Sequence, residues 1–279
     1  MQDNRPIGKE DYVEPRCVLC DEPYGAAPAP KPVPQQRIME KVDEYMSRRD
    51  YAGVERHLLY WLEEAKLGQD GKGEMMIRGE LVGHYRKTGE KDKAFAQAEA
   101  LLALIERIGM DGSVSAGTAY TNIATVYNAF GENERSLAVF ERARTIYEAT
   151  PSLDPSLLGG LYNNMALTYA ALGRFQEAYA LYDKALVTMA KVQNGVLEQA
   201  ITYLNMADAA EAELGPEDAA ESIEGYLDKA LELLNTPSVP RGGYYAFVCE
   251  KCAPTFSYYG YFLAANDLNE RARAIYERA

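Results

Sequence analysis

Two pairs of cysteines are the residues of this 279-residue chain best suited to chemistry. Both have the Cys-x-x-Cys spacing, which lets two sulfurs point at one ion, and four thiolates complete the closed tetrahedral shell of a structural zinc. In a reducing compartment the spacing favours metal or redox chemistry over structural disulfides. We therefore predict one structural Zn²⁺ held by Cys17, Cys20, Cys249 and Cys252. Reduced thiols, a redox disulfide within each pair, and zinc shared between two chains are the alternatives.

The rest of the sequence gives little indication of catalysis. Its two histidines, His57 and His84, form no His-Glu-x-x-His pair, and the chain has no Gly-x-Ser-x-Gly elbow for a serine nucleophile. Glycines 68, 71 and 73 lack the Lys-Ser/Thr and the preceding strand of a phosphate-binding loop. We expect no enzymatic activity.

Charge and composition narrow the range of partners. The chain has 42 acidic and 29 basic residues, a formal net charge of −13, which repels phosphate backbones and anionic membranes. No apolar run approaches the roughly 20 residues that span a bilayer, and the N-terminus lacks the apolar core of a secretion signal. We expect a cytoplasmic protein that binds neither nucleic acid nor membrane. Homo-oligomerisation stays open.

Glycines mark a repeating unit along the chain. Gly89, Gly131, Gly173 and Gly215 follow one another at intervals of 42 residues, each in a short polar turn. Glycine fits such a place because helices commonly end in a left-handed residue, which costs glycine no Cβ clash. Before each turn, small or apolar residues form a column that the aromatic residues Tyr85, Tyr127 and Tyr169 follow three positions later; its members are Val82, Ala124, Ala166 and Ala207.

This pattern resembles the tetratricopeptide repeat, in a long-helix variety of about 42 residues per unit. The resemblance is strongest over residues 75–235 and implies an all-α fold, a right-handed α-α superhelix of stacked helical hairpins. Ser136 stands where alanine is usual. Weaker units at 35–67 and 244–279 bring the total to about six hairpins, and we place Gly260 in the small-residue column of the last one.

The chain therefore divides into an N-terminal arm, residues 1–34, and a helical solenoid, residues 35–279. Alternating prolines between Ala26 and Pro34 favour polyproline II in the arm. Its last 14 residues would reach on the order of 40 Å at about 3.1 Å each. Such an arm could follow the groove of the solenoid and bring the two cysteine pairs together.

A row of asparagines gives the best candidate for a binding surface. Asn122, Asn164 and Asn205 recur at intervals of 42 and 41 residues, and Asn163 precedes the second. The resemblance implies that this place faces the concave groove, and we expect six residues nearby on the same side: Thr118, Thr121, Thr125, Asn128, Asp208 and Glu211. An asparagine amide can pair with the C=O and N–H of an extended peptide without reading its sequence. The alternative is that each amide links neighbouring hairpins.

The function that these features favour is a cytoplasmic protein-interaction scaffold. It would hold an extended polypeptide segment in its concave groove, and that segment could be its own N-terminal arm. The alternative is a zinc- or redox-dependent regulator in which the two cysteine pairs switch access to the groove.

Overall fold

The computed structural model describes residues 31–278 and is all-α over that range. Its twelve helices are α1 (Gln35–Ser47), α2 (Tyr51–Leu67), α3 (Gly71–Thr88), α4 (Lys91–Arg107), α5 (Val114–Ala129), α6 (Asn133–Ala149), α7 (Pro155–Ala171), α8 (Phe175–Met189), α9 (Val196–Leu214), α10 (Ala220–Leu234), α11 (Gly243–Tyr258) and α12 (Phe262–Tyr276). Consecutive helices pack in pairs, so the predicted six hairpins and all-α superhelical fold are confirmed.

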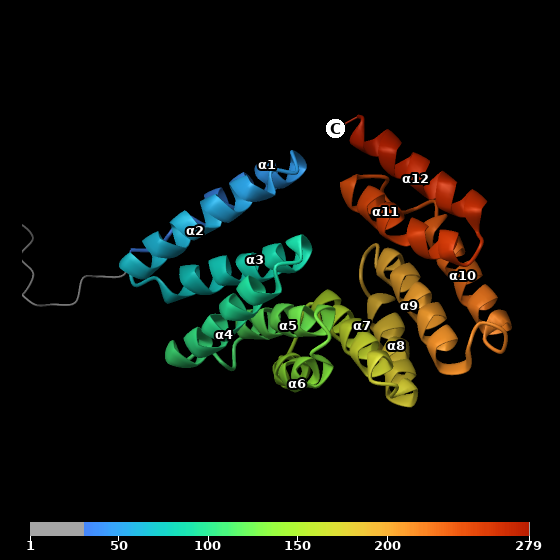
Figure 1. The fold of residues 1–279 in the computed structure, drawn as a ribbon, viewed down its shortest axis with the longest axis horizontal. Coiled ribbons are helices and arrows are strands. Elements are labelled where there is room, and N and C mark those ends of the chain that lie inside the picture. The colour runs from blue at the N-terminus through green and yellow to red at the C-terminus, as the bar shows by residue number, and fades with distance from the viewer. Residues whose placement is uncertain (1–30, 279) are drawn as a thin grey trace, which may run out of the picture.

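The hairpins are stacked in chain order along an arc (Figure 1). Each odd-numbered helix from α3 onward packs against the next odd-numbered helix, α3 on α5, α5 on α7, α7 on α9 and α9 on α11. Contact between successive first helices of the hairpins places them on the inner, concave side of the arc. Side chains on these helices therefore form the wall of any groove. Within residues 31–278, no helix is long and apolar enough to cross a bilayer.

The turn glycines all have the positive φ that the sequence predicts. Gly89, Gly131, Gly173 and Gly215 have φ of +76°, +81°, +71° and +83°. A residue with a Cβ rarely adopts these angles, which explains glycine at each turn. Gly260 was placed wrongly in the small-residue column. Its φ is +85° and it lies between α11 and α12, so it is the turn glycine of the last hairpin.

The small-residue column lies in the buried interior of the solenoid. Ala124 and Ala166 are completely buried, as are the other two members of the column. Ser136 is equally buried, and its hydroxyl donates a hydrogen bond of 2.8 Å to the backbone carbonyl of Ala124. A buried hydroxyl needs such a partner, so serine can replace alanine here without an unpaired polar group.

Two clusters of buried side chains fill the interior and meet at α9. Met206 and Ala209 pack with the first cluster, which extends from α1 to α9, and Leu204 and Ala207 pack with the second, from α9 to α12. Each hairpin thus buries its apolar surface mainly against its neighbours, as in other solenoids.

Candidate functional site

Equivalent positions on three inner helices carry polar side chains. Glu80 on α3, Asn122 on α5 and Asn164 on α7 are each separated by 42 residues. Asn122 is exposed, whereas Glu80 and Asn164 are half-buried. Our sequence analysis missed Glu80, although its spacing from Asn122 would have identified it. The row therefore begins with a carboxylate and continues with two amides.

A pocket of ≈ 400 Å³ opens between α3 and α5 at the start of this row. Glu80 and Asn122 line it together with three methionines, Met75, Met76 and Met110. Methionine side chains are flexible and polarisable, and they adapt to ligands of different shapes. The pocket thus combines an adaptable apolar wall with one carboxylate and one amide.

The third predicted asparagine has a different role. Asn205 on α9 donates a hydrogen bond of 3.0 Å from Nδ2 to Oδ1 of Asn163 on α7. The same oxygen accepts a bond of 3.1 Å from the hydroxyl of Thr202. These bonds join two adjacent inner helices. For Asn163 and Asn205 the geometry therefore favours the alternative, in which the amides link neighbouring hairpins.

Three further predicted groove residues are engaged locally. The hydroxyls of Thr121 and Thr125 donate to the backbone carbonyls of Gly117 and Thr121, at 2.9 and 2.8 Å. Nδ2 of Asn128 donates to Oδ1 of Asn133, at 3.1 Å, which ties the end of α5 to the start of α6. These side chains support the helices that form the groove.

Asp208 belongs to a cluster that joins α9 to α11. The hydroxyl of Tyr259 lies 3.0 Å from both Asp208 Oδ1 and Glu211 Oε2 and shares its single proton between them, and Tyr258 donates to Glu211 Oε1 at 3.1 Å. Burial raises the pKa of the Asp208 carboxyl, although its bond from Tyr259 opposes the shift. The sequence shows many tyrosines in this segment but not that two of them bind these acids.

The four-cysteine zinc site stays a prediction because Cys17 and Cys20 lie outside the described residues. Cys249 and Cys252 lie on α11, and both are almost fully buried among the side chains of the second core cluster. Burial raises the pKa of both thiols, that of Cys252 to about 12. The structure over residues 31–278 holds no group of three or more side chains able to ligate a metal.

The burial of Cys249 and Cys252 predicts very slow reaction with a thiol reagent. At pH 8 a pKa of about 12 leaves on the order of one Cys252 thiol in 10⁴ ionised, and the thiolate is the reactive form. In a Cys17→Ser/Cys20→Ser variant, Ellman's reagent should therefore label close to no thiol in native protein and two thiols in denaturant. Rapid labelling of both in the native state would contradict this packing of α11. Zinc measured in the unmodified chain and lost in this variant would instead support the predicted metal site.

Comparison with known proteins agrees with this architecture. Family models described as tetratricopeptide repeat match residues 74–149, which lie on α3 to α6, and residues 159–192, on α7 and α8. No curated protein gives a match.

The solved structures that match the chain include the following two. One is a putative kinesin light chain with nearly identical TPR-like repeats from Podosopora anserina; it is 21% identical, the alignment covers 71% of this chain and 92% of that one, and the TM-score is 0.48. Another is BtubC (BKLC) from P. vanneervenii, 18% identical, covering 88% of this chain and 91% of that one with a TM-score of 0.48.

The matched repeats and the observed hairpins point to the same assignment. The two matches cover the second, third and fourth hairpins, and the turn glycines with positive φ recur at the repeat interval. Arrays of this kind are typical of protein-interaction scaffolds rather than of enzymes. Residues 74–149 and 159–192 of the chain are therefore tetratricopeptide repeats.

Proposed function

We propose that the concave groove of this scaffold binds an extended polypeptide segment along α3, α5 and α7. The observation that carries the proposal is the pair Asn122 and Asn164, at equivalent positions one repeat apart. Unlike Asn163 and Asn205, they form no side-chain hydrogen bond with another residue in the range 31–278. Asparagine is unfavourable inside a helix, because its side-chain amide competes for the backbone hydrogen bonds. Its presence at these two positions therefore favours a role in binding.

Backbone capture is the chemistry that such amides supply. Each offers one acceptor and two donors, and an extended peptide presents C=O and N–H groups along its length. The acidic side chains on the same helices favour a neutral or basic segment. Glu80 on α3 is half-buried, and burial raises the pKa of its carboxyl, so this carboxylate is partly removed from water. A cation from the partner would offset that loss of hydration.

The N-terminal arm is one candidate segment. Its last described residues bind the turn between α2 and α3: the N–H of Lys31 donates to the carbonyl of Gly68 at 2.8 Å, and the N–H of Val33 donates to Asp70 Oδ2 at 2.9 Å. Gln35, which begins α1, lines the pocket beside Asn122. The chain therefore enters the solenoid close to one end of the proposed groove.

Site-specific cross-linking in cells of the native host tests the proposal. A photoreactive amino acid at Thr118, an exposed residue that lines the pocket, is expected to cross-link a polypeptide, whereas the same group at exposed Ala138 on outer helix α6 is not. Mass spectrometry of the product identifies either the chain's own arm or another protein. Equal yields at the two positions, or none at either, would contradict groove binding.

For a segment identified in this way, Asn122→Ala combined with Asn164→Ala is expected to weaken binding about 5- to 150-fold. The range corresponds to two lost hydrogen bonds of about 0.5–1.5 kcal/mol each. Asn205→Ala is the matched control, because its amide bonds to Asn163. It should lower the melting temperature more than the affinity. Unchanged affinity in the double variant would leave the row without a role in binding.

A further inference from the structure

The pocket between α3 and α5 has a composition that is unusual for a groove that captures only backbone. Three methionine side chains form its apolar part, and Met75 is buried while Met76 and Met110 are half-buried. Glu80 and Asn122 supply the polar part. We name these five residues the Met–Glu pocket. Its volume of ≈ 400 Å³ is enough for a long side chain.

Glu80 lies in this pocket, and within residues 31–278 it forms no ion pair with a lysine or arginine. Burial and the nearby Asp43 carboxylate both raise its pKa, and no lysine or arginine acts in the opposite direction. Lys72 also lines the pocket, but it precedes Glu80 by eight residues on the same helix, about 12 Å at 1.5 Å per residue. Lys72 is exposed to solvent and forms no ion pair with Glu80 within residues 31–278.

We propose that the Met–Glu pocket receives a lysine or arginine side chain of the bound segment. The aliphatic stem would lie between Met75, Met76 and Met110, and the cationic head would meet the Glu80 carboxylate beside the Asn122 amide. This inference rests on the proposed function, and it adds a side-chain preference to the capture of backbone.

The methionine wall and the Glu80 carboxylate together favour lysine or arginine over other side chains. Lysine and arginine combine a three- or four-carbon stem with a charged head, and they bury the stem on apolar surface while the head seeks a polar group. Hydrogen bonds between a cation and a carboxylate are about twice as strong as those between neutral groups. A purely apolar side chain would fill the methionine wall but leave Glu80 uncompensated, and an acidic one would face the negative charges of Glu80 and Asp43.

Methyl NMR of the full chain with ¹³C-methyl methionine tests the inference. Leucine replacements at Met75, Met76 and Met110 assign the three signals among the nine methionines. N-acetyl-L-arginine methylamide and N-acetyl-L-lysine methylamide are the probes, and N-acetyl-L-norleucine methylamide, which has a similar stem without charge, is the comparison. We expect saturable shifts of the Met76 and Met110 signals with the cationic probes at concentrations where norleucine produces none.

Glu80→Gln is expected to weaken binding of the cationic probes at least about tenfold, since it removes the charge while keeping the shape. This variant should fold, because it replaces a partly dehydrated carboxylate by a neutral amide, and unchanged far-UV circular dichroism checks that. Glu221→Gln, at an exposed position on outer helix α10, is the matched change of charge and should have no effect.

Two results would overturn the inference. Equal binding of norleucine and arginine probes would mean that the pocket is apolar only, and equal affinity in wild type and Glu80→Gln would remove the carboxylate from recognition. Each is distinguishable from failure of the proposed function, which is tested by cross-linking from Thr118. A groove that cross-links a segment but does not distinguish the probes captures backbone without a basic anchor.

Discussion

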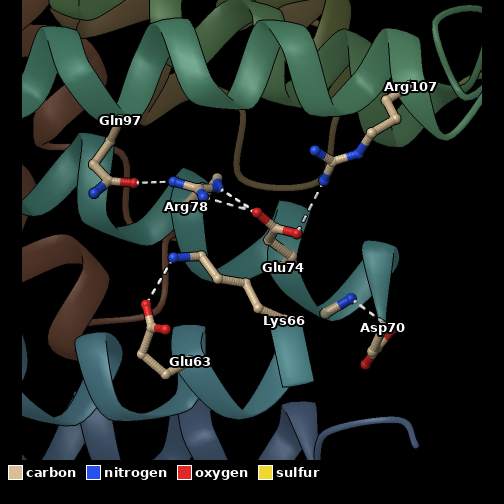
Figure 2. Close-up of polar contacts among 8 residues, drawn as sticks. Glu63, Lys66, Asp70, Glu74, Arg78, Gln97 and Arg107 are labelled. Carbon is tan, nitrogen blue, oxygen red and sulfur yellow. Dashed lines mark hydrogen bonds and ion pairs between the residues drawn. The ribbon is translucent and has the colours of Figure 1, made fainter. Parts of the chain in front are cut away.

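Replacing Glu74 with alanine is expected to lower the free energy of unfolding by about 3–5 kcal/mol. Glu74 and Arg78 lie one turn apart on α3, and both are buried, with 6% and 8% of their surface exposed. Arg78 binds Glu74 Oε1 through Nε and Nη2, each at 2.8 Å (Figure 2). Without the carboxylate, the guanidinium stays charged in a region of low dielectric. The cost is the uncompensated charge, which exceeds the net value of the ion pair.

The ion pair also joins α3 to α4. Arg78 Nη1 donates to Oε1 of Gln97 at 2.6 Å, and Arg107 Nη2 lies 3.3 Å from Glu74 Oε2 (Figure 2). Both partners are on α4, so the network holds the two helices of the second hairpin together. Loss of Glu74 should therefore reduce hydrogen-exchange protection in both α3 and α4.

An exposed pair in the same region provides the control. Glu63 and Lys66 on α2 approach to 2.7 Å, but 66% and 40% of their side chains are exposed. Glu63→Ala should change the free energy of unfolding by no more than about 1 kcal/mol, because water screens such pairs. Urea denaturation followed by far-UV circular dichroism compares the variants.

A double variant separates the effect of the buried charges from the effect of the volume that the Glu74 and Arg78 side chains occupy. Changing Glu74 to leucine together with Arg78 to methionine should recover most of the lost stability, since apolar residues of similar volume often replace a buried pair without cost. Equal, small effects of Glu74→Ala and Glu63→Ala would mean that the pair is not buried in solution.

The structural features that could be predicted from the sequence are those that recur at the repeat interval. Glycine recurs at 42-residue intervals because the turn of each hairpin needs a residue with positive φ. Gly89 and its counterparts could therefore be assigned to these turns from the sequence. Gly260 was misplaced because the interval from Gly215 is 45 rather than 42. Periodicity therefore placed the turn glycines wherever the interval was constant, and it misplaced the one that follows a longer interval.

Contacts between side chains could not be predicted from the repeat interval. The sequence predicted neither the burial of Glu74 with Arg78 nor the place of Glu80 in the inner pocket. The i, i+4 spacing of Glu74 and Arg78 allows an ion pair at the surface or in the interior, and the sequence alone does not distinguish them. The asparagine row was likewise predicted as one set, and only the contacts separate Asn205, bonded to Asn163, from Asn122 and Asn164.

Asp70→Ala is expected to destabilise the chain by about 2–4 kcal/mol, because the carboxylate performs two tasks. Its Oδ1 accepts the N–H of Gly73 at 2.9 Å and caps α3, which contributes about 0.5–2 kcal/mol. Its Oδ2 accepts the N–H of Val33, also at 2.9 Å, and leaving that buried donor unpaired costs about 1–3 kcal/mol. The second bond holds the segment before α1 against the turn between α2 and α3.

The N-cap residue of α2, Asp50, provides a comparison that separates the bond to Val33 from the capping of a helix. Asp50 caps α2 in the same way, with Oδ1 accepting the N–H of Gly53 at 2.8 Å, but its side chain makes no bond to the segment before α1 within the described residues. Asp50→Ala should cost about 1 kcal/mol, the typical value for a cap. Asp70→Ser, which can cap but reaches less far, should fall between the two. Hydrogen exchange should show loss of protection at the Val33 amide in Asp70→Ala and Asp70→Ser but not in Asp50→Ala. Equal losses of stability for Asp70→Ala and Asp50→Ala, with Val33 still protected, would show that capping accounts for the whole effect.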